Sequence, residues 1–358
     1  MLSRLRLKIG PNPKPGLDSR LASFGHVSHR TKSPSRSQST FTEKRHHLGV
    51  EAAEGKIDID SFRKLAYDPK IPLLLRASHR FPANEKWFQF SEKGSYPSFS
   101  PYFLTFADEV FPYEFTIPRV THHDKPNSEH EILPVFLKWL TSYEDRGSSR
   151  NAMCETIVKS IIHDAHSHNP FAFHQFDAPA ALMIAACQFN EDRDPSERLK
   201  KLYIAQSDLS HLPKPLFEDL PVPDVVKHAG KGDIYSSSIW LGLQPTYTPL
   251  HRDPNPNLFC QLLGSKRIRL MPPDRGDRIY AHVRKELGLN GNSRFRGTEM
   301  MEGRERQLLH EVVWGDATIS EVLVKPTDAL FIPMGWWHSV ASNGAEGNLN
   351  ASVNWWFR

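Results

Sequence analysis

The stretch from Thr248 to Lys266 constrains the fold of this chain more than any other. It reads TPLHRDPNPNLFCQLLGSK, so His251 and Asp253 are two residues apart. Successive side chains on a β-strand point to opposite faces, and these two therefore point to the same face. A neutral imidazole beside a carboxylate supplies two of the three ligands of a 2-His-1-carboxylate site. Such sites hold non-haem Fe(II) and keep coordination positions open.

The third ligand is expected on a distant strand. Residues 331–340 read FIPMGWWHSV and place His338 among apolar residues that suit the wall of a barrel. The predicted metal ligands, which are also the predicted catalytic residues, are therefore His251, Asp253 and His338.

The residues after the first two ligands favour a hairpin. Asn257 to Leu263 is a mostly apolar run, Gly264-Ser265 is typical of a turn, and Lys266 to Leu270 alternates charged and apolar residues. Lys266 then begins the returning strand, close to the metal. A lysine inside a barrel is costly unless an anion accompanies it. A dicarboxylate co-substrate would supply that anion, and the Thr248 hydroxyl would be a second hydrogen-bond donor.

Two other groups of histidines are interpreted without a metal. His122-His123-Asp124 repeats the ligand types, but it lies among prolines with no strand pattern, which indicates a solvated loop. A second group includes His163 and His174, and Asn169-Pro170 breaks the element that would have to bring its members together. Exposed or hydrogen-bonded histidines are the preferred interpretation of this group, which comprises His163, His166, His168 and His174.

The segment from about Tyr203 to Arg358 resembles the JmjC family of cupin-type Fe(II)/2-oxoglutarate oxygenases. It is most similar to the small hydroxylase branch that includes the asparaginyl hydroxylase of the hypoxia-inducible factor. That branch has the pattern Thr/Ser-x-x-His-x-Asp, an Asn six residues after the His and a Lys fifteen residues after it. The residues at those places in this sequence are Thr248, His251, Asp253, Asn257 and Lys266.

The resemblance also implies roles for residues outside this stretch. Leu202 to Gln206 is similar to the family's Tyr-Leu-x-Gln strand, in which the tyrosine contacts the 2-oxoglutarate carboxylate. An aromatic on the preceding strand is matched by Trp240, and Ser352 to Trp356 resembles the closing strand of the site. One departure is Pro326-Thr327-Asp328, where the family has Gly-Asp, and it concerns a turn. The implied co-substrate contacts are Lys266, Thr248, Tyr203, Asn257, Trp240 and Asn354.

The fold class that follows is mainly β with flanking helices, a double-stranded β-helix of the cupin or jelly-roll type. We expect a basic, Ser- and Pro-rich tail over 1–48, an N-terminal helical and strand part of the catalytic unit over 49–200, and a barrel core over 201–358. Residues 274–318 form an insert between barrel strands. Such an insert is expected at the mouth of the barrel, where it would help to choose the substrate.

The basic charge of the chain is concentrated in the tail. Residues 1–45 carry ten basic and two acidic side chains, a net charge of +8, and the whole chain is +4, which leaves −4 for the remainder. A mildly acidic body argues against a broad nucleic-acid-binding surface. Arginine, serine and few acidic residues in the tail favour a mitochondrial transit peptide, with a disordered cytoplasmic or nuclear tail as the alternative.

The three cysteines, Cys154, Cys187 and Cys260, are widely spaced and are expected as buried apolar residues, not as disulfides or zinc ligands. No apolar run approaches the roughly 18 residues of a membrane span, so no membrane partner is expected. The sequence leaves the oligomeric state open.

The resemblance implies a dioxygenase that hydroxylates a C–H bond of a protein side chain, with Fe(II), 2-oxoglutarate and O2. The alternatives are a JmjC-type histone lysine demethylase, an RNA-base hydroxylase, a metal-dependent cupin isomerase and a non-catalytic binding scaffold. An isomerase would not need Lys266 and Thr248, and the intact ligands disfavour a scaffold.

Overall fold

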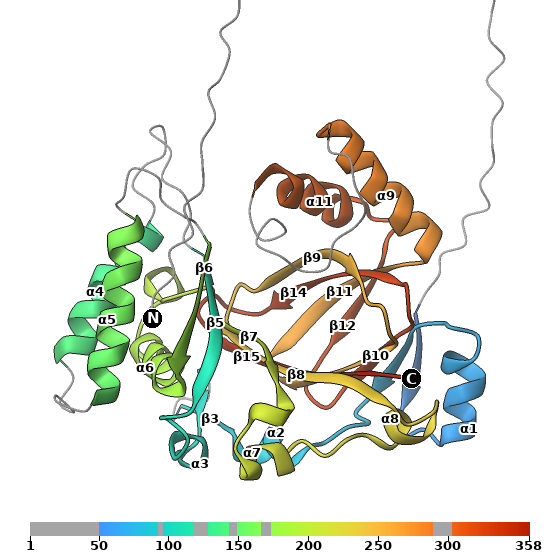
Figure 1. The fold of residues 1–358 in the computed structure, drawn as a ribbon, viewed down its shortest axis with the longest axis horizontal. Helices are drawn as coiled ribbons and strands as arrows, with labels where there is room; N and C mark the ends of the chain where they lie inside the picture. The colour runs from blue at the N-terminus through green and yellow to red at the C-terminus, as the bar shows by residue number, and fades with distance from the viewer. Residues whose placement is uncertain (1–49, 92–95, 117–127, 143–148, 166–172, 289–302) are drawn as a thin grey trace, which may run out of the picture. The chain divides into compact units, whose positions relative to one another are not determined.

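The computed structural model describes residues 50–91, 96–116, 128–142, 149–165, 173–288 and 303–358. Residues 47–358 form one compact unit. The tail predicted over 1–48 lies outside the described residues. The unit is built on a nine-stranded sheet, the larger sheet, and a four-stranded sheet, the smaller sheet (Figure 1).

Eight strands from the C-terminal half form a barrel of two facing sheets. The larger sheet contributes β8, β10, β13 and β15, and the smaller sheet consists of β9, β11, β12 and β14. This is a double-stranded β-helix, so the predicted fold class is confirmed. The bounds are β8 Ile234–Leu243, β9 Tyr247–Arg252, β10 Asn257–Leu263, β11 Ser265–Met271, β12 Ser320–Val324, β13 Ala329–Ile332, β14 Trp337–Asn343 and β15 Leu349–Phe357.

The predicted hairpin between residues 257 and 270 is wrong. β10 pairs with β13 and β15, whereas β11 pairs with β12 and β14. The chain passes from one sheet to the other at Gly264, where φ is +67°, a conformation that glycine adopts readily. A Cβ there would lie 2.6 Å from Asn350 Nδ2, so a side chain would also meet the neighbouring strand. The strands β12 and β13, which follow the insert, are divided between the two sheets in the same way.

The N-terminal part extends the larger sheet on both sides of the barrel. One side adds β7, β5 and β6, and the other adds β2 and β1, so the predicted parts 49–200 and 201–358 share one sheet. These strands are β1 Glu51–Glu54, β2 Leu73–Arg76, β5 Val110–Thr116, β6 Phe173–Pro179 and β7 Leu202–Asp208, and a separate pair is β3 Phe88–Phe90 with β4 Pro97–Phe99.

Helices of the N-terminal part pack against the outer face of the larger sheet (Figure 1). The long ones are α4 Ser128–Ser142, α5 Ser149–Ala165 and α6 Ala180–Glu191. The N-cap of the first helix is Asp58, whose side chain accepts from Ser61 N. The short helices are α1 Ile59–Phe62, η1 Arg63–Tyr67, α2 Pro82–Lys86, α3 Pro101–Leu104, η2 Pro195–Glu197, η3 Leu209–His211, α7 Lys214–Glu218 and α8 Asp224–His228.

The side chains of β15 point alternately into the hydrophobic core and into the inside of the barrel. Ala351, Val353, Trp355 and Phe357 are buried in the core beneath the helices. The opposite face of the strand carries the buried polar residues Asn350, Ser352 and Asn354, which face the barrel interior, followed by the half-buried Trp356. This strand therefore stabilises the fold with one face and lines a polar chamber with the other. The three cysteines are also buried, as predicted.

The insert covers the outer face of the smaller sheet. Its helices are α9 Pro273–Glu286 and α11 Gly303–Gly315, and their apolar residues Val283, Leu309 and Val313 pack against Met271 and Trp337 of the sheet. The predicted place at the mouth is therefore wrong for these two helices, and residues 289–302 lie outside the described residues. α9 begins at Pro273, since proline suits the first helical position.

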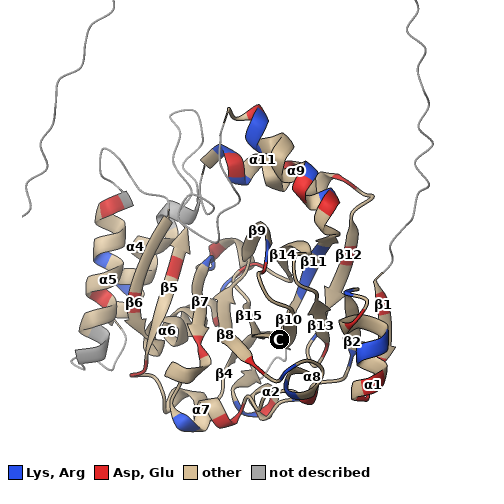
Figure 2. Cartoon of the chain, turned by 45° about the vertical axis from the view of Figure 1, so that its right-hand side comes forward, with Lys and Arg blue, Asp and Glu red and all other residues tan. Residues whose placement is uncertain are grey.

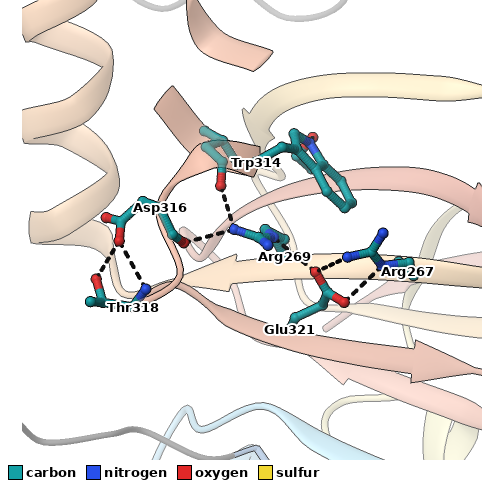
Figure 3. A network of polar contacts seen from close by, with 8 residues as sticks. Arg267, Arg269, Trp314, Asp316, Thr318 and Glu321 are labelled. Atoms are coloured by element: carbon teal, nitrogen blue, oxygen red, sulfur yellow. Dashed lines mark hydrogen bonds and ion pairs between the residues drawn. The ribbon is translucent and has the colours of Figure 1, made fainter. Parts of the chain in front are cut away.

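A buried arginine fixes the end of α11 to this sheet (Figure 3). Arg269 of β11 donates to the carbonyl oxygens of Val313 and Asp316 at 2.8 and 2.7 Å and to Glu321 Oε2 at 2.9 Å. Hydrogen bonds from Arg267, followed by those from Arg269, lower the pKa of Glu321.

Charges of both signs cover α9 and α11, and a basic stretch marks β11 (Figure 2). No helix in the described part of the chain has the length and apolar character needed to cross a bilayer.

His79, which follows β2, is expected to make folding pH-dependent. Burial, the largest cause, lowers the pKa of His79 from 6.5 to about 4, while in the unfolded chain it titrates near 6.5. As the pH falls between these values the unfolded state takes up a proton that the folded state does not, so stability is lost, by at most about 3 kcal/mol.

The test is urea unfolding of the wild type and His79→Gln at pH 7.5 and pH 5. The variant should lose less stability between the two conditions. His282→Gln, which changes an exposed histidine of α9, is the control. Equal losses in the wild type and His79→Gln would contradict this assignment.

Candidate metal centre and co-substrate pocket

The three predicted metal ligands lie together. His251 of β9 and His338 of β14 are direct cross-strand partners, and Asp253 follows the end of β9. The two imidazole centroids are 4.1 Å apart, and His338 Nε2 lies 3.6 Å from Asp253 Oδ2. One ligating atom from each residue can be chosen so that all lie within 4.8 Å of one another, which is found for no other group of such side chains in the described part of the chain.

A β-bulge places Thr248 and the ligands on one face. Residues three apart on a regular strand point to opposite sides, so regular alternation would turn the Thr248 side chain away from that of His251. The register between β9 and β14 shifts here: His338 pairs with His251, but Val340 pairs with Thr248. The bulge absorbs one residue at Pro249, and both side chains then face the barrel interior. Pro249 is tolerated because β9 is an edge strand.

Backbone carbonyls set the tautomer of both histidines. His251 Nδ1 lies 2.8 Å from the carbonyl oxygen of Pro249, and His338 Nδ1 lies 3.2 Å from that of Trp336. A carbonyl oxygen only accepts hydrogen bonds, so each Nδ1 carries the proton and donates it. In each ring Nε2 is then the nitrogen with a lone pair for a metal. The donor set therefore fits a divalent metal, with two imidazole nitrogens and one carboxylate oxygen.

Two asparagines hold the carboxylate ligand. Asn257 Nδ2 donates to Asp253 Oδ2 at 2.9 Å, and Asn354 Nδ2 donates to Asn257 Oδ1 at 2.9 Å. Because an ionised carboxylate only accepts, Asp253 fixes the orientation of the first amide and, through it, the second. Asn354 Oδ1, which is buried and has no hydrogen-bond partner among the described residues, is left as an acceptor. The co-substrate contacts predicted for Asn257 and Asn354 stay predictions, while their contacts in the structure orient Asp253.

Asn257→Ala is expected to weaken metal affinity about 10-fold, the lower end of the effect of losing a partner of a metal ligand. The loss of the amide frees Asp253 Oδ2 to rotate and leaves Asn354 Nδ2 without its acceptor. The affinity is measured by Co(II) titration. The control is Asn343→Ala, which removes an exposed amide from β14 that donates to Ser265 Oγ. An unchanged Co(II) affinity in Asn257→Ala would contradict the role.

A buried lysine marks the second part of the site. Lys266 is the second residue of β11, is only 3% exposed and faces the barrel interior. Its Nζ donates to Ser352 Oγ at 2.9 Å and to the Tyr203 hydroxyl at 3.4 Å. It also lies over the rings of Tyr203 and Phe259, 5.8 and 5.4 Å from their centroids. A cation surrounded by hydroxyls and aromatic rings suits a carboxylate ligand.

The other predicted pocket residues lie near this lysine or near the ligands. Trp240 of β8 is half-buried, and its ring centroid lies 5.9 Å from that of Tyr203. Thr248 is half-buried on β9, and its carbonyl oxygen accepts from Ser339 Oγ at 2.9 Å. Ser352 is a pocket residue that the sequence reasoning missed. Its signal was its position two residues before Asn354, which places both on one face of β15.

β15 links the two parts of the site. Ser352 contacts the lysine and Asn354 contacts the amide that holds Asp253. Ser352 and Asn354 lie on the same face of β15, so this strand connects the buried lysine to the carboxylate ligand Asp253 through Asn257.

Two of the four histidines that were interpreted without a metal lie within the described residues. His163 is exposed on α5 and His174 is half-buried on β6. His166, His168 and the His122-His123-Asp124 stretch lie outside the described residues.

Comparison with known proteins agrees with the fold and the site. Residues 120–358 match the family model of the cupin-like domain. Jumonji C domain-containing protein 5 of Drosophila melanogaster is 30% identical over 167 residues, 46% of this chain and 39% of that protein. Lysine-specific demethylase JMJ30 of Arabidopsis thaliana is 30% identical over 162 residues, 45% of this chain and 35% of that protein.

Lysine-specific demethylase 8 of Danio rerio is 32% identical over 157 residues, 43% of this chain and 36% of that protein. Each of these matches spans less than half of the relative's length. The predicted resemblance is confirmed: the chain belongs to the family of cupin-like domain proteins and has JmjC proteins among its relatives.

Proposed function

We propose that this chain is an Fe(II)- and 2-oxoglutarate-dependent oxygenase that hydroxylates a C–H bond of a protein side chain. The observation that carries the proposal is the pair of sites inside the barrel: a 2-His-1-carboxylate centre and a buried lysine, which β15 connects through Ser352 and Asn354. When bound, the iron supplies the redox chemistry by which O2, 2-oxoglutarate and R–H give succinate, CO2 and R–OH.

The residues of the chain have distinct tasks in this proposal. His251, Asp253 and His338 hold the metal, and Asn257 keeps the carboxylate in place. Because the chain supplies only three ligands, a bound metal would keep positions open for the keto acid and dioxygen. The far carboxylate is held by donors from four strands, namely Lys266, Tyr203, Ser352 and Thr248. Trp240 beside Tyr203 gives the pocket an apolar wall, which helps to exclude water.

A lysine demethylase is the second candidate, and it is supported by the names of two relatives. Its chemistry at the metal is the same, but the attacked carbon is an N-methyl group, and the product then releases formaldehyde. The isomerase and scaffold alternatives leave the buried Lys266 without a role. The mildly acidic body gives an RNA-base substrate no support from charge.

The test is succinate release by Fe(II)-loaded protein with 2-oxoglutarate and oxygen, first alone and then with protein substrates. Iron-dependent succinate without formaldehyde, together with a 16-Da increase of a substrate peptide, is expected. Formaldehyde release from methyl-lysine peptides would instead assign the demethylase activity. Folded protein that neither binds nor turns over 2-oxoglutarate would rule out the oxygenase.

A further inference from the structure

The residues that flank the metal ligands point away from the barrel. Arg252 lies between His251 and Asp253, and Trp337 precedes His338. Arg252 and Trp337 are cross-strand partners, one position along from the His251–His338 pair. Because side chains alternate on a strand, the ligands face inward while these two face the insert helices.

One carboxylate oxygen of α9 joins both flanking residues. Asp277 Oδ1 accepts from Arg252 Nη1 at 3.0 Å and from Trp337 Nε1 at 3.1 Å. The guanidinium also lies over the Trp337 ring, 5.2 Å from its centroid. Asp277 thereby connects the end of β9, next to His251 and Asp253, to β14, which carries His338.

α9 approaches this point closely. A Cβ on Gly276 would lie 2.1 Å from the Trp337 ring, so only glycine allows the helix to come so near. One turn further along, the Tyr280 ring lies 5.1 Å from that of Trp337. Trp337 is 1% exposed, and the contact is therefore closed to solvent.

α11 makes a matching link on the other side of His338. Trp314 Nε1 donates to Ser339 Oγ at 3.1 Å, and Ser339 Oγ donates to the Thr248 carbonyl oxygen at 2.9 Å. Both neighbours of His338 in the chain are thus hydrogen-bonded on the outer face, Trp337 to α9 and Ser339 to α11.

We propose that α9 and α11 form an outer brace that sets the spacing of the metal ligands, with Asp277 as its positioning residue. The inference rests on the proposed function because it presupposes a metal at His251, Asp253 and His338. β9 needs such support: it is an edge strand, a bulge interrupts it beside His251, and Asp253 lies beyond its last residue.

The test compares Asp277→Ala with Asp274→Ala. Asp274 is on the same helix and forms an exposed ion pair with Arg278, so it is a matched control. Co(II) affinity and the positions of the Co(II) d–d bands, which report ligand geometry, are measured beside the melting temperature of the metal-free protein. Arg252 and Asp277 are about half exposed, and such pairs contribute little to stability.

We expect Asp277→Ala to bind Co(II) about 10-fold more weakly, the lower end for residues that orient metal ligands, and to shift the d–d bands. Asp274→Ala should match the wild type in both, and metal-free Asp277→Ala should melt only slightly below it, because Trp337 Nε1 loses its acceptor. A second variant, Gly276→Ala, keeps Asp277 but pushes α9 outward and should shift the bands in the same direction.

The outcomes separate the two proposals. Wild type that binds Co(II) through His251 while Asp277→Ala keeps the same affinity and bands would overturn the brace alone. A metal-free Asp277→Ala that melts far below Asp274→Ala would also overturn it, because the residue would then act on the fold. Wild type that does not bind Co(II) would overturn the metal centre and the brace together.

Discussion

Replacing His251 with alanine is expected to abolish metal binding and all 2-oxoglutarate turnover. Its Nε2 is one of three ligating atoms, and the carbonyl of Pro249 holds the ring in the tautomer that binds a metal. Loss of a ligand should cost more than the 10–100-fold in affinity that loss of its hydrogen-bond partner costs. Isothermal titration with Mn(II) under anaerobic conditions and succinate assays measure the two effects.

His282→Ala is the control for His251→Ala, because it removes an exposed imidazole of α9 that faces only Glu286, at 3.9 Å. His282→Ala should bind Mn(II) and release succinate as the wild type does. Retention of Mn(II) binding in folded His251→Ala would place the metal elsewhere and contradict the site.

Replacing Lys266 with methionine is expected to raise the KM for 2-oxoglutarate about 10- to 100-fold. Charge-assisted hydrogen bonds contribute about 1.5–3 kcal/mol, and methionine keeps the length of the side chain without the ammonium group. Mn(II) affinity should remain that of the wild type, because Lys266 is not a metal ligand. Steady-state kinetics in 2-oxoglutarate and anaerobic titration with Mn(II) separate the two quantities.

Arg267→Met is the matched control on the same strand. Its guanidinium points to the opposite face and pairs with Glu321 at 2.7 and 2.8 Å, so its loss should leave the KM for 2-oxoglutarate unchanged. Lys266→Met should not melt below the wild type, since an apolar residue replaces a buried charge. Equal KM values in the wild type and Lys266→Met would remove the lysine from the co-substrate site.

The ligands were predictable from sequence because their geometry is local or nearly so. Two residues on one strand, His251 and Asp253, must share a face, and a third histidine in an apolar strand completes the set. Lys266 was predictable for a related reason: a charged residue whose alternation turns it into a barrel needs an anion. Neither inference requires knowledge of which strands are neighbours.

Strand partners were not predictable in the same way. The residues around Gly264 have the composition of a hairpin turn, but in this barrel the chain crosses there to the other sheet. Local composition marks where a strand ends, whereas the partner is chosen by closure of the barrel. The missed strand β6 and helix α11 have a similar cause, because packing against the rest of the protein stabilises them.

The residues that orient the ligands were also beyond the sequence. Every residue has a backbone carbonyl, so nothing in the sequence distinguishes that of Pro249. Ser352 and Asp277 have no distinctive spacing from the ligands. They acquire a role only when the strands and α9 come together. Supporting residues of a site therefore need the tertiary structure, even where the ligands do not.

The bulge at Pro249 makes the length of β9 part of the chemistry. Thr248 and His251 are three residues apart. The bulge shifts the alternation of side chains by one residue, so both side chains face the barrel. Removing one residue there would leave Thr248 and His251 two residues apart, so a regular strand without the bulge would still present both side chains to the barrel, while His251 and Asp253 would keep their mutual spacing. Such a variant would separate the need for a threonine hydroxyl on the inner face from the need for its present distance from the metal ligands.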